Sequence, residues 1–423
     1  MQTSGMWRSG ISALFCLALV VTTTGCAADP GSGPSRVGNT VAIGVDLPFA
    51  ADPDGAAKET WNAMNLYLER AGGMAGPHKV ELIQYDNSPP PNASWTTAEC
   101  IRNAGNHVAN RREVAVIGTR FSGCSKAQVP ILNRAADGPM LMVSHTDTNP
   151  GLTKTWDTGE PAMYGPSGQR SYARVITTDD MQGVAAAQFA ARDLGVRTCF
   201  VLNDGGTYGV GLAKSFTAEA VRLGIQIVGE ATWQRESEHY RDLFGKAAGA
   251  DCVYFGGIYD NHGDQLIKDK VAVLGDNNAV MLLAPDGFLG YPDFVQRPEA
   301  AGVYLTYTGL GMEGLVTSGN DSLAHFLAGY QSRYGENPES PFAIYGVQAL
   351  QVVLAAIERS DGTRRDVWVK VFGGAGITIA ADNAILGKPV SIDPASGDVS
   401  ARDISIAVVK DGEETIVKAL TTS

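Results

Sequence analysis

The chain has 423 residues, 44% of them hydrophobic and 18% charged, a composition typical of globular proteins and long enough for two domains with separate cores. Lysine and arginine number 33 and aspartate and glutamate number 45, which gives a net charge of −12. This acidic balance argues against nucleic-acid binding, which needs a basic face.

The first 25 residues predict a secretory signal. Arg8 is their only charged side chain, and the apolar run at 11–21 is shorter than the roughly 20 residues that span a bilayer. Residues 23–26, Thr-Thr-Gly-Cys, resemble the bacterial lipobox, whose cysteine is lipid-modified, although a threonine replaces the usual leucine. Cys26 is therefore the expected lipid anchor, and a plain cleavable signal is the alternative. Residues 26–39, rich in Gly, Ser, Pro and Ala, predict a flexible tether.

From residue 40 onward, short apolar strands alternate with amphipathic helices. Strands are expected at 41–47, 79–85, 114–118 and 139–144, and helices at 57–71, 94–109 and 125–135. This alternation is typical of a parallel sheet with right-handed crossovers. A polar stretch at 154–172 follows and predicts a long loop.

The series then restarts, which predicts a second lobe of the same kind. Strands are expected at 198–202, 225–229, 252–257 and 279–284, and helices at 182–194, 211–223, 240–248, 263–274, 322–334 and 342–359. Open parallel sheets bind ligands at the carboxyl ends of their strands. Two such lobes facing each other would line one cleft.

Four cysteines remain beyond the signal and Cys26: Cys100, Cys124, Cys199 and Cys252. An even number in an oxidising compartment predicts two disulfides. Cys199 and Cys252 open two predicted strands at matching positions, and these strands would be neighbours in a sheet ordered 2-1-3. No cysteine lies in a CxxC pair and the six histidines are scattered, so we expect neither a metal nor a cofactor.

Eight segments in order carry a resemblance to a known family. They are 71–73 with 80–82, 114–118, 148–153, 179–183, 208–213, 253–257, 286–287 and 301–304. Together they resemble the type I periplasmic binding proteins of the branched-chain amino acid and amide class, which serve ABC transporters. The resemblance covers about 41–412.

The resemblance implies an α/β fold of two Rossmann-like lobes, each a parallel sheet flanked by helices, joined by a hinge that the chain crosses near 175, 308 and 388. The first lobe would comprise 40–175 plus 309–388, and the second 176–308 plus 389–423. The Cys100–Cys124 pairing follows from the same resemblance.

The implied function is that of the extracytoplasmic solute-binding component of an ABC importer. It would be a monomer that is lipid-anchored outside a bacterial cell membrane, and its partners would be a small amino-acid-like or amide-like ligand and a membrane permease. Because the sequence holds neither a Gly-x-Ser-x-Gly nor an HExxH motif, we expect no enzyme. A ligand-sensing receptor domain is the alternative. Such a sensor normally continues into a transmembrane segment, which this sequence lacks up to Ser423.

The family's ligand residues match five positions here. Ser122 and Thr148 would bind a carboxylate, the carbonyl of Thr146 and the acid of Asp286 would bind an ammonium group, and Tyr208 would contact the ligand. Each has a plainer alternative, namely a helix cap for Ser122 and Asp286, a turn bond for Thr148 and a core position for Tyr208.

Two departures put leucine-like specificity in doubt. The loop at 48–55 lacks the family's tyrosine and offers Phe49 and two aspartates, and Ile258 replaces an aromatic residue, with Tyr259 next to it. Ile258 and Tyr259 are both candidate ligand contacts. Arg120 could reach a second ligand anion, with a solvated surface arginine as the alternative.

Overall fold

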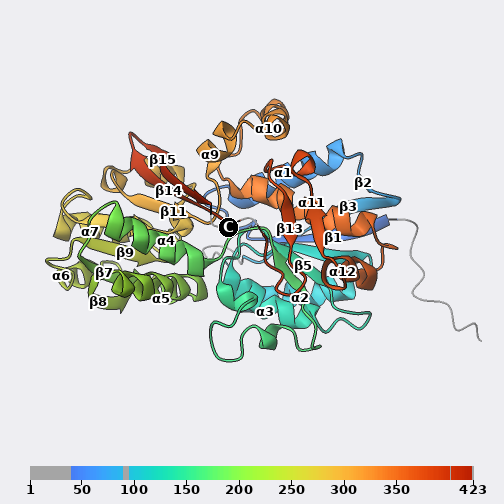
Figure 1. The fold of residues 1–423 in the computed structure, drawn as a ribbon, viewed down its shortest axis with the longest axis horizontal. Helices are drawn as coiled ribbons and strands as arrows, with labels where there is room; N and C mark the ends of the chain where they lie inside the picture. The colour runs from blue at the N-terminus through green and yellow to red at the C-terminus, as the bar shows by residue number, and fades with distance from the viewer. Residues whose placement is uncertain (1–39, 89–94, 401, 422–423) are drawn as a thin grey trace, which may run out of the picture. The chain divides into compact units, whose positions relative to one another are not determined.

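The computed structural model describes residues 40–88, 95–400 and 402–421, which form two α/β lobes (Figure 1). The predicted signal, Cys26 and the tether lie outside these residues. In the described part of the chain, no helix is long and apolar enough to cross a membrane.

The first sheet has six strands in the order β2-β3-β1-β4-β5-β6. They are β1 (Thr40–Leu47), β2 (Met74–Ala75), β3 (His78–Asp86), β4 (Glu113–Gly118), β5 (Leu141–Ser144) and β6 (Tyr172–Arg174). All pairs are parallel except β2–β3. β4 and β5 are buried throughout, which explains their continuous apolar runs.

Helices cover both faces of this sheet. They are α1 (Ala56–Arg70), α2 (Thr97–Ala109), α3 (Ser122–Leu132), α11 (Phe342–Glu358) and α12 (Arg364–Phe372), and α10 (Asp321–Tyr334) packs on α1. The helices α1 and α11 lie side by side, and so do α2 and α3 (Figure 1). α11 is buried over almost its whole length because it packs against α1, β4 and β5.

The second sheet has seven strands in the order β15-β14-β11-β10-β9-β7-β8. They are β7 (Thr198–Asn203), β8 (Gln226–Thr232), β9 (Cys252–Gly256), β10 (Met281–Ala284), β11 (Tyr304–Tyr307), β14 (Asp403–Lys410) and β15 (Glu413–Thr421). β7 to β11 pair in parallel, and β14 and β15 add an antiparallel hairpin at one edge. The prediction of two parallel-dominated α/β lobes is therefore confirmed, with an antiparallel edge in each sheet.

The flanking helices of the second sheet are α4 (Asp179–Arg192), α5 (Thr207–Arg222), α6 (Arg241–Gly245), α7 (Gly263–Leu274) and α8 (Pro292–Val295). Two hydrophobic clusters lie on the two faces of this sheet. One gathers around α4 and α5, and the other around α6, α7 and α8.

One expected boundary is wrong. The resemblance assigns residues 389–423 to the second lobe from a crossing near 388. In the structure, β13 (Val390–Ile392) pairs with β12 (Ile377–Ile379), and Val390, Ile392 and Val399 are buried in the first lobe's core. The third crossing therefore lies after Val399, just before β14.

The stretch at 154–172 is a loop as expected, but two ordered pieces belong to it. A 3-10 turn, η2 (Ala162–Tyr164), lies within it, and β6 begins at its end. β6 was not expected, because its three residues include the charged Arg174 and form no apolar run.

The two predicted disulfides are confirmed. Cys100 in α2 is bonded to Cys124 in α3, with Cα atoms 5.5 Å apart, and Cys199 is bonded to Cys252, with Cα atoms 4.7 Å apart. The second pair lies directly opposite in the register of β7 and β9. All four side chains are fully buried, so both bridges are protected from solvent reductants.

Candidate functional site

A small cavity lies at the carboxyl ends of strands from both sheets. It is lined by Arg120, Phe121, Ser122, Thr146, Tyr208, Ile258, Asp286, Gly287, Tyr291 and Phe342. Its volume of about 50 Å³ leaves room for little more than a water molecule. Strand-end loops of both lobes therefore nearly close on each other here, which is where open parallel sheets bind ligands.

The first lobe contributes hydroxyl groups. Ser122 begins α3, yet its side chain makes no helix cap, because its Oγ accepts the backbone N–H of Asn149 at 3.2 Å. Thr146 follows β5, and its Oγ1 donates to the carbonyl of Thr119 at 3.0 Å. The cap expected as the alternative for Ser122 is thus not what the structure shows.

Thr148 does not line the cavity and is 1% exposed. Its hydroxyl and the carboxylate oxygens of Asp179 form no hydrogen bond of good geometry in the described chain, although the hydroxyl lies close enough to the carboxylate to lower the pKa of Asp179. The backbone N–H of Asp179, at the start of α4, donates to the carbonyl of Thr148 at 3.0 Å. Buried polar atoms without partners are rare in proteins and mark a place where a ligand could supply them.

The second lobe contributes a tyrosine and an acid. Asp286 follows β10, and its Oδ1 accepts the hydroxyl of Tyr208. Its Oδ2 accepts the hydroxyl of Thr308 at 2.6 Å, and the N–H of Gly287 donates to the Tyr208 hydroxyl at 3.0 Å. Asp286 is therefore no helix cap, and Tyr208 is half-buried at the cavity wall rather than in the core.

Two buried carboxyl groups act on each other at this site. Burial raises the pKa of Asp179 well above its usual range, and the charge of Asp286 raises it further. Burial also raises the pKa of Asp286, while hydrogen bonds from Thr308 and Tyr208 lower it. Such a pair favours either protonation or the arrival of a cation.

Arg120 is neither solvated nor unpaired. Its side chain is 9% exposed, and its guanidinium forms a two-pronged bond with Asp54, in which Nη1 lies 2.7 Å from Oδ1. Asp52 lies 3.6 Å away. The aspartates of the loop at 48–55 thus compensate the charge of this arginine at the cavity wall.

Ile258 and Tyr259 lie in different surroundings. Ile258 lines the cavity. Tyr259 does not, because its ring packs among Phe288, Tyr291 and Phe294, while its hydroxyl donates to Asp293 at 2.9 Å. The aromatic walls of the cavity come instead from Phe121, Tyr291 and Phe342, which sequence reasoning did not single out.

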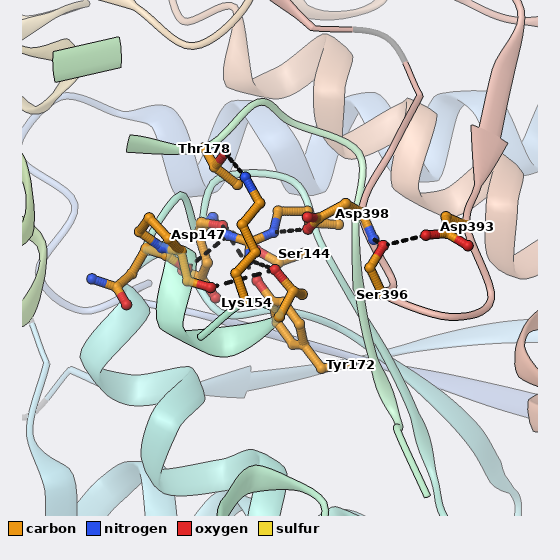
Figure 2. Close-up of polar contacts among 12 residues, drawn as sticks. Ser144, Asp147, Lys154, Tyr172, Thr178, Asp393, Ser396 and Asp398 are labelled. Carbon is orange, nitrogen blue, oxygen red and sulfur yellow. Dashed lines mark hydrogen bonds and ion pairs between the residues drawn. The ribbon is translucent and has the colours of Figure 1, made fainter. Parts of the chain in front are cut away.

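A buried arginine holds the loop that carries Thr148. The Nη1 of Arg174 donates to the carbonyls of Asp147 at 2.8 Å and of Asn149 at 3.0 Å, and its Nε donates to Asp398 at 2.9 Å. Figure 2 shows Asp147, Tyr172 and Asp398 gathered in this network, near the bond from Lys154 to Thr178. The loop that carries Thr148 is therefore tied to β6, through Arg174, and to the turn that carries Asp398.

Across residues 40–88, 95–400 and 402–421, no group of three or more His, Cys, Asp or Glu side chains could hold a metal ion.

Known proteins resemble the chain over nearly this whole region. A family model described as a periplasmic binding protein matches residues 40–380. An amino acid binding protein of Pseudomonas aeruginosa is 25% identical over 382 residues, which cover 86% of this chain and 88% of that protein. A Leu/Ile/Val-binding protein homolog of Brucella melitensis is 26% identical, over 75% of this chain and 77% of its own.

Solved structures share the fold at lower identity. A leucine-binding protein from Thermotoga maritima has a TM-score of 0.71 at 22% identity and covers 90% of this chain and 98% of its own. A solute-binding protein from Rhodopseudomonas palustris, solved with 4-hydroxybenzoate, has a TM-score of 0.72 at 16% identity, with 91% and 97% covered. The same architecture thus occurs in a leucine-binding protein and in a protein solved with 4-hydroxybenzoate.

Proposed function

The chain belongs to the periplasmic binding protein family, and from this premise we propose that it binds a small amino-acid-like solute between its lobes and delivers it to the permease of an ABC importer. Its family consists of substrate-binding proteins, which act outside the cytoplasm, and not of enzymes. The observation that carries the choice of ligand is the buried pair of Asp179 and Asp286 beside Tyr208.

The two ends of an amino acid match the two sides of the site. The hydroxyls of Ser122 and Thr148, with the backbone N–H groups that begin α3, suit a carboxylate or an amide oxygen. Asp179 and Asp286 suit an ammonium group, because a cation between them would relieve the cost of two buried acids. A ligand with both ends bridges the lobes, which favours closure.

The same pair argues against an aromatic acid. Relatives of this fold were solved with benzoate and with 4-hydroxybenzoate. In this chain such a ligand would satisfy the hydroxyl side only and would leave both Asp179 and Asp286 without a cation. The aromatic walls at Phe121, Tyr291 and Phe342 instead suit the ligand's side chain.

We expect calorimetric titration to detect binding of amino acids or their amides and none of benzoate. Small-angle scattering should then show a smaller radius of gyration with saturating ligand, since the bound ligand draws the two lobes together. Benzoate and 4-hydroxybenzoate are the matched controls, because they carry the carboxylate without the amine. Binding of these acids, with no amino acid or amide bound at about 1 mM, would refute the assigned ligand class.

The same proposal includes a lipid anchor on Cys26 and a monomeric binding domain. Its support is the apolar segment, the small residues before Cys26 and the tether that follows. Mass spectrometry of the native protein is expected to find acyl groups on an N-terminal Cys26. A mature N-terminus located beyond residue 26 would show that the chain is released instead.

A further inference from the structure

A fully buried acid lies in the loop after β5, next to residues that line the interlobe cavity. This acid, Asp147, does not itself line the cavity. Its Oδ2 accepts the hydroxyl of Ser125, which is equally buried and belongs to the first turn of α3. The carboxylate therefore joins the loop that carries Thr148 to the helix that begins with Ser122.

The same network reaches the loop between β4 and α3. The hydroxyls of Ser125 and Thr119 lie 3.1 Å apart, and Thr119 directly precedes three residues that line the cavity. The carbonyl of Thr119 accepts the hydroxyls of Ser144 at 3.3 Å and of Thr146 at 3.0 Å. The hydroxyl of Ser144 accepts the backbone N–H of Asp147 at 2.9 Å (Figure 2). The two strand-end loops are thus bonded to each other at several points, and Asp147 takes part through both its side chain and its backbone.

The charge of Asp147 is compensated only in part. Arg174 donates to the backbone carbonyl of Asp147 at 2.8 Å, whereas its ion pair is with Asp398. Neighbouring hydroxyls and the charge of Arg174 lower the pKa of Asp147, but burial has the larger effect and raises it to about 7. A buried acid is costly in such surroundings. Its direct contribution to the network is the acceptor that it offers to Ser125.

We propose that Asp147 is a positioning residue of the ligand site, which fixes the hydroxyls of Ser122 and Thr148 relative to each other without contacting the ligand. The inference rests on the function proposed above, because it concerns the same site. The two hydroxyls belong to different strand-end loops, so bonds between these loops set their spacing. One such bond runs from the N–H of Asn149 to Oγ of Ser122, and Asp147 with Ser125 supplies another. Binding groups must be held within about 0.5 Å of their productive geometry, so loss of the second bond should lower affinity.

Hydrogen–deuterium exchange of the ligand-free protein tests the positioning directly. Asp147→Leu has a side chain of similar length and branching but offers no acceptor to Ser125, so the segments 119–125 and 145–149 should exchange about tenfold faster. Ser125→Ala removes the same bond from its other end with a smaller change and should have the same effect. Asp147→Asn keeps an oxygen that can accept the Ser125 hydroxyl, so it should exchange nearly as slowly as the wild type. Asp269→Leu is the matched control, because it removes an equally buried acid on α7, and it should lower Tm without faster exchange in these segments.

Calorimetric titration then shows which end of a ligand is affected. The probes are L-leucine and isocaproamide, an uncharged amide with the same side chain and no amine. Asp147→Leu and Ser125→Ala should weaken both probes about tenfold, because both carry the oxygen end that Ser122 and Thr148 suit, and Asp147→Asn should weaken them about twofold. Thr148→Val should weaken L-leucine less in the Asp147→Leu background than in the wild type, because coupled residues are not additive.

Three results would each overturn the inference. They are unchanged exchange in both segments of the Asp147→Leu and Ser125→Ala variants, wild-type affinity of these variants for L-leucine, and full additivity of Asp147→Leu with Thr148→Val. A wild type that binds neither probe would count against the proposed ligand class instead. The exchange measurement needs no ligand and would still decide whether Asp147 positions the two loops.

Discussion

Asp286→Asn is expected to weaken the binding of an amino acid by about a hundredfold, because it removes one of the two carboxylates that would compensate the ligand's buried ammonium group. Asparagine has nearly the same shape, and its one oxygen can accept either the Tyr208 or the Thr308 hydroxyl, while its NH2 group can donate to the oxygen of the other. The fold and the closure of the site should therefore survive. Calorimetric titration of the wild type and the variant with the same ligand measures the loss.

Matched ligands and a matched variant separate charge from shape. The affinity for an uncharged amide ligand should fall far less than the affinity for an amine, because no ionised group of the amide is left unpaired. Asp264→Asn alters an acid in the first turn of α7 that does not line the small cavity, and it should change neither affinity. Equal affinity of the Asp286 variant and the wild type for an amine would rule out the ammonium role.

The same binding event should move protons. In the empty site, burial raises the pKa values of Asp179 and Asp286, and the charge of Asp286 raises that of Asp179 further. An ammonium ion stabilises the ionised carboxylates and lowers those pKa values, which releases protons. The affinity for an amine should thus rise as pH rises through the raised pKa values of the empty site. Titrations in two buffers with different ionisation enthalpies would measure the release.

Part of the site could be predicted because its residues directly follow predicted strands. Ser122, Tyr208 and Asp286 each follow a readable apolar strand, and the ends of parallel strands must meet at one edge of the sheet. Asp179 was missed because an acid at the first position of a helix normally reads as a solvated partner of the helix dipole. Only the tertiary contacts show that it is fully buried beside another acid.

The other features that were not predicted depend on contacts between residues far apart in the sequence. Arg120 was weighed as a solvated side chain because its partners, Asp52 and Asp54, lie more than sixty residues earlier in the chain. The third crossing was placed too early because Val390 and Ile392 form only a three-residue strand whose partner is β12. β6 was missed for a similar reason, since its Arg174 looks unlike a core residue until its acceptors are known.

Arg174→Met is expected to lower the free energy of unfolding by about 3–5 kcal/mol, because it leaves Asp398 buried without its cation. Arg174 is fully buried, so solvent cannot replace its charge. The carbonyls of Asp147 and Asn149 would also lose their donor, which would free the loop that carries Thr148. Ligand affinity should fall together with stability. Urea denaturation followed by circular dichroism measures the first effect and calorimetry the second.

The pH dependence of this loss of stability tests whether Asp398 is its cause. Burial alone would raise the pKa of Asp398, but the charge of Arg174 holds it below its usual range. A lowered pKa adds stability that is present above the unfolded value, about 3.9, and is lost as pH falls. The stability gap between the wild type and Arg174→Met should therefore narrow as pH falls, first where the uncompensated Asp398 of the variant takes up a proton and then below about pH 4, where the wild type loses the ion pair. Arg222→Met removes a solvent-exposed partner of Glu219 and should lower stability far less than Arg174→Met does. If Arg174→Met costs no more than this surface control, the ion pair with Asp398 does not hold the hinge segments together.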